Sequence, residues 1–137
     1  MQPLILKIDG DPVPWAAPTF SRKGTYDKKA QAKKVIVWKL KTKYRGIPIE
    51  GALQVDFFFG MPVPTSQSKK KRDLMLAGKI FHTCKPDRDN MQKLYSDALE
   101  KSRILKNDSQ IVAGQSKKFY HSQPHTLIII QRLDHGD

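Results

Sequence analysis

The chain has 137 residues, with 25 lysines and arginines against 13 aspartates and glutamates and a formal net charge of +12. This length fits a single domain, and the 39% of apolar residues excludes a chain too polar to fold. No apolar run approaches the roughly 20 residues that a membrane helix needs, and charge comes too early for a secretory signal, so we expect no membrane segment and a cytoplasmic location.

The N-terminal half predicts two strands separated by a loop and a helix. Pro3 to Asp9 alternates apolar and polar side chains, as a strand does. Gly10 to Gly24 contains three prolines and is expected to be a loop. Lys28 to Tyr44 is rich in lysine and alanine and is expected to be helical, although a β-prone run lies inside it. Ala52 to Phe59 alternates again and predicts the second strand.

Two helices are expected next. The range Ser66 to Ala77 predicts a short helix capped by its first serine, and Gly78 follows where a C-terminal glycine cap belongs. Lys85 to Lys101 gives the clearest helical pattern, with Asp89 as the expected N-cap and Gln92 at the capping-box spacing. Its apolar stripe consists of Met91, Leu94, Tyr95, Ala98 and Leu99.

Two final strands are predicted over Gln110 to His121 and His125 to Leu133. The element order is then β-α-β-α-α-β-β. We expect residues 1–137 to form a single α/β domain with one small mixed β-sheet and helices packed on it. The run Phe57-Phe58-Phe59 places apolar side chains on both faces of its strand, which fits either a surface buried against a second subunit or a central strand covered by helices on both sides.

Four aspartates, Asp87, Asp89, Asp97 and Asp108, lie close together in a chain where acidic residues are scarce. Clustered carboxylates raise one another's pKa and cost stability, and a divalent cation removes that cost. Mg²⁺ prefers oxygen ligands and binds through a few carboxylates plus substrate phosphate, where it can polarise a phosphodiester and orient a water. Lys93, one turn beyond Asp89, could contact the scissile phosphate or orient that water.

Each of these residues also has an ordinary explanation. Asp89 can serve only as a helix cap, and Asp87 can belong to the turn before it. We expect Asp97 to support the site, or to pair with Lys93 at the i, i+4 spacing, rather than to bind metal. Asp108 lies in an Asn-Asp-Ser turn. A helix about 18 Å long separates Asp108 from Asp87, and the sequence alone does not show that the fold brings them together.

The excess of positive charge indicates a polyanionic partner, with nucleic acid ahead of an anionic membrane surface. Contacts from lysine to phosphate give affinity without sequence selectivity, and binding should weaken steeply with salt. Trp15, Phe20 and Tyr26 could stack on unpaired bases or belong to the core. The residues expected to contact DNA form two clusters, one of Lys28, Lys29, Lys33 and the lysines up to Lys43, the other of Lys69, Lys70, Lys71 and Arg72.

Several kinds of site are excluded. Cys84 is the only cysteine, so no disulfide can form within the chain. His82 and Cys84 have the spacing of two zinc ligands, but His121 and His125 are not arranged to complete a finger. The chain has no P-loop and no glycine-rich dinucleotide motif, so no nucleotide cofactor is expected.

The second half of the chain contains a series of short, mostly polar runs: Lys85-Pro86-Asp87-Arg88-Asp89-Asn90, then Lys93, then Asp97-Ala98-Leu99, then Asn107-Asp108-Ser109-Gln110. This series resembles the RusA family of Holliday junction resolvases. That family's pattern is KPD-x-DN-x-x-K, then DAL, then a D/N-D-x-Q turn that leads into a strand. Asn107 departs from it, because many members carry another aspartate there. Gly10 to Pro14 and Ser68 to Arg72 resemble the family's early loop and basic segment more loosely.

The resemblance implies a homodimeric endonuclease that cuts four-way DNA junctions by paired symmetric nicks with Mg²⁺, or with Mn²⁺ in its place. A two-fold dimer would match the symmetry of the junction. Two alternatives stay open: a non-catalytic basic protein that binds branched DNA or RNA, and a structural protein associated with ribosomes. The resemblance assigns metal binding to Asp87, Asp89 and Asp108, catalysis also to Lys93, and supporting roles to Asn90 and Asp97.

Overall fold

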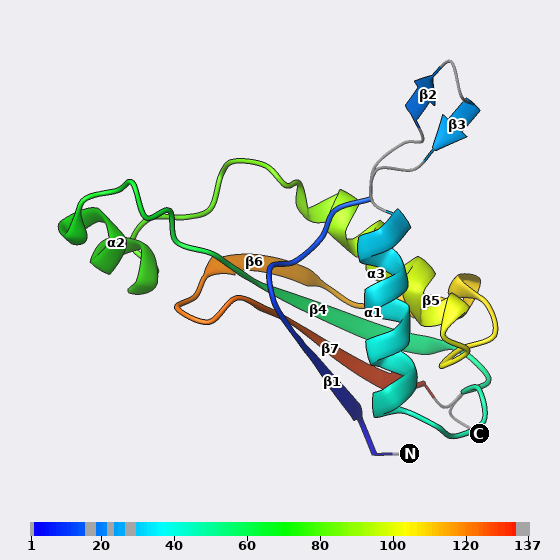
Figure 1. Ribbon diagram of the computed structural model, residues 1–137. Helices are drawn as coiled ribbons and strands as arrows, with labels where there is room; N and C mark the ends of the chain where they lie inside the picture. Colours follow the sequence, from blue (N-terminus) through cyan, green and yellow to red (C-terminus); the bar gives the residue numbers. More distant parts are fainter. Residues whose placement is uncertain (1, 16–18, 22–23, 27–29, 134–137) are drawn as a thin grey trace.

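In the computed structural model the described residues are 2–15, 19–21, 24–26 and 30–133, and they form a mixed sheet, a separate hairpin and several helices (Figure 1). The sheet contains β1 (Leu4–Asp9), β4 (Leu53–Met61), β5 (Ile111–Ala113), β6 (Ser116–Tyr120) and β7 (His125–Arg132). The remaining elements are the hairpin strands β2 (Thr19–Ser21) and β3 (Gly24–Tyr26), the helices α1 (Ala30–Lys43), α2 (Lys69–Leu76) and α3 (Arg88–Lys101), and the short 3-10 helix η1 (Asp108–Gln110).

The central strand of the sheet is β4. It pairs antiparallel with β7 along one edge, and β5 and β6 both run parallel to its other edge. Beyond β7, β1 forms the outer strand in an antiparallel pair. Every second side chain from Leu53 to Met61 is buried, as the alternation of a strand requires. The predicted strand is therefore confirmed, and it continues past Phe59 to Met61.

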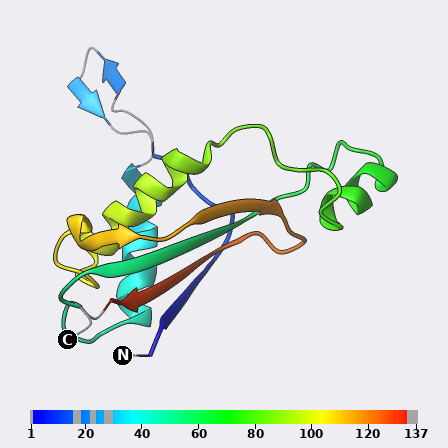
Figure 2. The same cartoon turned by 180° about the vertical axis from the view of Figure 1, so that it is seen from behind.

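Both long helices pack on the same face of the sheet (Figures 1 and 2). α1 contributes Ile36 and Leu40 to the core, and the whole predicted stripe of α3 is buried. Burying a side chain of this size contributes about 1.5–3 kcal/mol, so this layer supplies much of the stability. Tyr95 of α3 lies against Phe59 of β4, with ring centroids 5.7 Å apart.

The short helix α2 lies beyond the end of the sheet (Figure 1). Its N-cap is Ser68, whose Oγ accepts a hydrogen bond of 3.2 Å from the amide of Lys71, so the cap expected at Ser66 was wrong. Gly78 closes the helix in the left-handed region at φ 76°, as predicted.

Two predicted segments are divided in the structure. The strand expected over Gln110 to His121 is two strands, β5 and β6, separated at Gly114. Gly114 has φ 137°, and a Cβ there would overlap the carbonyl oxygen of Val55. The chain therefore leaves and rejoins the edge of β4 at a residue without a side chain. The loop expected over Gly10 to Gly24 is also interrupted, because β2 pairs with β3.

The predicted α/β fold with a mixed sheet and packed helices is confirmed. The buried apolar side chains of the sheet, α1 and α3 form one continuous cluster. Among the described helices, none combines the length and the apolar character needed to cross a bilayer.

We expect Gly114→Ala to lower the free energy of unfolding by more than about 2 kcal/mol. Alanine is strained at this positive φ, and its methyl group would overlap the backbone of β4 at Val55. Gly78→Ala is the matched control, since Gly78 also has positive φ but has open space around it. Gly78→Ala should lower the free energy of unfolding by only about 1 kcal/mol. Urea unfolding of both variants measures the difference, and equal losses would contradict the close approach to Val55.

Candidate functional site

Two predicted site residues lie at the N-terminus of α3. The N-cap is Asp87, not Asp89 as expected, and its carboxylate makes no capping hydrogen bond. Asp89 lies in the first turn, where the helix dipole favours a negative charge. Both aspartates are exposed. The end of α3 therefore presents two carboxylates whose oxygens are available to a ligand.

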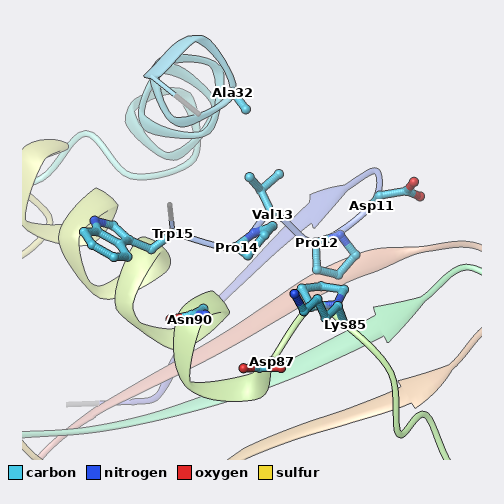
Figure 3. Close-up of a pocket in the computed structure, with 10 residues that line it drawn as sticks. Asp11, Pro12, Val13, Pro14, Trp15, Ala32, Lys85, Asp87 and Asn90 are labelled. Carbon is cyan, nitrogen blue, oxygen red and sulfur yellow. The ribbon is translucent and has the colours of Figure 1, made fainter. Parts of the chain in front are cut away.

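A loop from the N-terminal region is docked beside this helix end. The amide of Trp15 donates to the carbonyl oxygen of Asn90 over 2.8 Å, and the amide of Val13 donates to the hydroxyl of Tyr95 over 3.2 Å. Asp11 and Asp87 line the cleft of about 620 Å³ between the loop and the helix (Figure 3). Nothing in the sequence indicated that this proline-rich loop closes one side of the site.

The side chain of Lys93 also contacts this loop. Its ammonium nitrogen lies 3.6 Å from the centroid of the Trp15 ring, which is a cation–π geometry. Trp15 is half-buried, so its ring is packed in place and contacts the Lys93 ammonium from the side of the loop. Lys93 thus lies on the flank of α3 that faces the loop, one turn from Asp89, as the sequence suggested.

Asp97 joins α3 to α1. It pairs with Lys33 of α1 and, at 3.7 Å, with Lys101 of α3, and not with Lys93, the partner that the i, i+4 spacing offered. The Lys33 side chain is only 15% exposed. Lys33 therefore joins α1 to α3, which differs from the exposed DNA contact expected of it.

Asp108 lies beyond the opposite end of α3. Its amide donates to Glu100 Oε1 over 3.1 Å. The turn that contains it is closed by a capping box between Asn107 and Gln110, and the Gln110 amide group donates to the backbone of Ile49. The sequence placed a capping box at Asp89 instead.

The three predicted metal ligands do not meet in one chain. α3 has 14 residues and is about 21 Å long, so Asp108 is separated from Asp87 and Asp89 by the length of the helix. Within the described parts of the chain, no three histidine, cysteine, aspartate or glutamate side chains are close enough to hold one metal ion. Within one copy of the chain Asp108 therefore lies apart from Asp87 and Asp89, which remain as a pair, and Mg²⁺ commonly uses one or two carboxylates with substrate phosphates.

The segment before α3 is tied to β6 by residues that the sequence did not single out. Lys118 Nζ donates to the carbonyl oxygens of Cys84 and Pro86 over 2.8 and 3.1 Å. Arg88 donates to the carbonyl oxygen of Ser116 over 3.2 Å. In an alternating strand Lys118 looks like any solvated lysine, and only the tertiary structure reveals these contacts.

Among the basic residues, Lys69, Lys70 and Lys71 are exposed on α2, and Arg72 is half-buried there. The predicted contacts Lys28 and Lys29 lie outside the described residues, and so do the side chains of Phe20 and Tyr26.

His82 packs next to the same segment. Its Nε2 lies 3.6 Å from Cys84 Sγ, and its ring packs edge-on against Tyr120 with centroids 5.1 Å apart. Burial lowers the pKa of His82 below its ordinary value of 6.5, and the neighbouring Lys118 ammonium lowers it further. The imidazole is therefore kept neutral beside the start of α3.

Comparison with known proteins identifies relatives. A family model described as endodeoxyribonuclease RusA matches residues 9–131. The uncharacterized protein YqaN of Bacillus subtilis (strain 168) is 37% identical over 82 residues, which cover 60% of this chain and 57% of that protein. The match thus spans little more than half the length of this relative.

We expect stability to fall as the pH drops below about 6.5, because the unfolded chain then binds a proton at His82 that the folded chain binds less readily. The stability that the neutral His82 contributes is fully present above the pKa of His82 in the unfolded chain. It is lost as the pH falls towards the lower pKa of His82 in the folded chain. His82→Phe should show a smaller loss over the same range. Urea unfolding of both proteins as a function of pH measures this, and parallel pH curves would rule out His82 as a source.

Proposed function

This chain belongs to the RusA family of endodeoxyribonucleases, and we propose that it is a Mg²⁺-dependent endonuclease that resolves four-way DNA junctions by paired symmetric nicks. The family match over residues 9–131 carries the proposal. The formal charge of +12 supports DNA as the partner, and a site of action in the cytoplasm follows from that substrate. Paired nicks require two sites, so we also propose that the protein acts as a homodimer of single-domain subunits.

We propose that the active centre is formed by the N-terminus of α3 and the loop docked on it. Asp87 and Asp89 would hold the metal ion together with a phosphate of the substrate. When bound, Mg²⁺ supplies a Lewis acid for the phosphodiester. Within one subunit Asp108 lies apart from this pair, because the length of α3 separates them, and its proposed role in metal binding stays a prediction.

The other residues of this centre have roles that follow from their contacts. Lys93 offers a positive charge beside the carboxylates, where a scissile phosphate would lie, and the Trp15 ring limits the directions in which its ammonium can point. Asn90 supports the centre through its carbonyl oxygen, which anchors the loop. Asp97 supports it indirectly by fixing α3 to α1.

We propose that α2 grips the DNA backbone. It begins with four consecutive basic residues, three of them exposed, and projects beyond the sheet (Figure 1). Such contacts supply affinity through the release of counterions and carry no sequence information.

Asp89→Asn should reduce cleavage of a synthetic four-way junction by roughly 100-fold or more, because a metal ligand stabilises the transition state by several kcal/mol. Binding should persist or tighten, since a negative charge near the phosphates is removed. Cleavage and gel-shift assays with Mg²⁺ and with EDTA measure both properties.

The matched control is Glu50→Gln, which makes the same change of charge at an exposed residue paired with Lys106. It should cleave like the unmodified protein. Tight binding without cleavage by the unmodified protein under any divalent ion would instead support the non-catalytic binding protein.

Replacing Lys69, Lys70 and Lys71 together by alanine should weaken junction binding and flatten its salt dependence. Removing one lysine–phosphate pair lowers the slope of log K against log salt by about 0.9, so the slope should fall by up to about 2.7. Lys33→Ala is the contrasting variant, because its ion pair with Asp97 predicts reduced stability with an unchanged slope. An unchanged slope in the triple variant would mean that α2 does not contact DNA.

A further inference from the structure

A second cleft lies between the C-terminal end of α2 and the strand β6. Its volume is about 390 Å³, which falls in the range of about 300–1,000 Å³ that is typical of pockets for small organic groups. It shares no lining residue with the cleft at the N-terminus of α3. Apolar residues of α2 line it together with three aromatic and two cationic side chains, which are Phe81, Phe119, Tyr120, Lys117 and Lys118.

Much of the apolar lining of this cleft is exposed to solvent. Phe81 is 75% exposed, and Leu76 at the end of α2 is 46% exposed. Neither side chain is needed to fix α2, because the buried residue of that helix is Met75. A single exposed apolar side chain is ordinary, but several that line one hollow indicate a binding surface.

The charges of the cleft favour nucleic acid as the ligand. Among the described residues that line it, none is acidic, and both charged ones, Lys117 and Lys118, are cations. Aromatic rings next to cations, without carboxylates, are the combination that binds single-stranded nucleic acid, because bases stack on the rings and phosphates pair with the ammonium groups. The rim of a protein interface is more often of mixed charge.

The edge of β6 adds hydrogen-bonding groups to the cleft. The amide of His121 donates to the carbonyl oxygen of Met61 over 2.9 Å, so every second residue counted back from His121 bonds to β4. In a parallel pair the residues between them direct their amides and carbonyls away from the partner strand. Lys118 and Tyr120 are two of these residues, and both line the cleft. Their backbone groups can therefore hydrogen-bond the edge of a planar base.

Lys118 ties this cleft to the start of α3. Its Nζ donates to the carbonyl oxygens of Cys84 and Pro86, and Asp87 follows directly in the chain. From Phe81 to Asp87 the chain spans at most about 22 Å, at about 3.6 Å for each residue. That distance corresponds to about six nucleotides at 3.4 Å each. A base in the cleft would thus lie within about six nucleotides of a phosphate held at Asp87.

We propose that this cleft binds an unpaired nucleobase of the DNA substrate, stacked on Phe81, with an adjoining phosphate beside Lys117. A base inside a duplex is stacked between its neighbours and does not reach such a cleft, whereas an unpaired base swings out at little cost. The cleft therefore selects DNA whose pairing is interrupted near the cut. This inference rests on the proposed nuclease and adds to it a contact that distinguishes branched DNA from a continuous duplex.

The test is the affinity for DNA, measured with EDTA so that no strand is cut. Phe81→Ala should weaken binding of a single-stranded oligonucleotide about 10-fold, because a stacked base contributes that much affinity. Binding of a fully paired duplex of the same length should change by less than about two-fold. Phe81→Tyr should retain the affinity of the unmodified protein, whereas Phe81→Leu, which is apolar but has no ring, should not.

The matched control is Trp38→Ala, which removes an aromatic side chain that is 65% exposed on α1 and outside the cleft. It should leave both affinities unchanged. Salt dependence separates stacking from charge, since Lys117→Ala should lower the slope of log K against log salt for the single strand by about 0.7 and Phe81→Ala should not change it. Thermal unfolding checks that each variant is folded, which the exposure of Phe81 and Lys117 favours.

Unchanged binding of the single strand by Phe81→Ala, or an equal loss of affinity for the duplex, would overturn the base-binding cleft. Retention of full affinity by Phe81→Leu would overturn the stacking on which it depends. Because the measurement needs no catalysis, a selective loss in Phe81→Ala together with an unmodified protein that cuts no DNA would refute only the proposed nuclease.

Discussion

The contact between α3 and β4 joins two apolar surfaces of different periodicity. Alternate side chains of β4 face the helix, and they pack against apolar side chains of α3 that recur every three or four residues. Tyr95 is the largest fully buried side chain in this layer, and its hydroxyl accepts the amide of Val13 from the loop beyond the helix. The packing that stabilises the core therefore also fixes the direction of α3 and the position of both its ends.

The candidate site follows from that direction. At its N-terminus α3 meets β6, where Lys118 and Arg88 tie the two elements together, and the loop that contains Trp15 closes the other side. At its C-terminus α3 meets η1, where Glu100 binds the amide of Asp108. The helix is thus both the scaffold for Asp87 and Asp89 and the spacer that keeps Asp108 away from them.

Periodicity made the main elements predictable, because the buried stripe of α3 and the alternation of β4 are local properties of the sequence. The N-cap residues were harder to predict, because Asp87 and Asp89 are equally good cap residues and only the backbone shows where the helix starts. The other errors involved partners far apart in the chain. The break at Gly114 depends on Val55, and the position of Asp108 depends on the hydrogen bond from Gln110 to the backbone of Ile49. The partner of Asp97 could not be chosen by spacing either, because only the packing of α1 on α3 selects Lys33.

The position of α2 has a consequence for how a nuclease of this shape would meet its substrate. α2 is joined to the rest of the protein by two connecting segments and stands away from the sheet (Figure 1). If its lysines contact DNA as proposed, they would form a second point of attachment for DNA bound at the cleft, and two linked attachments bind more tightly than either alone. Such a gain in affinity would be lost on DNA too short to reach both α2 and the cleft.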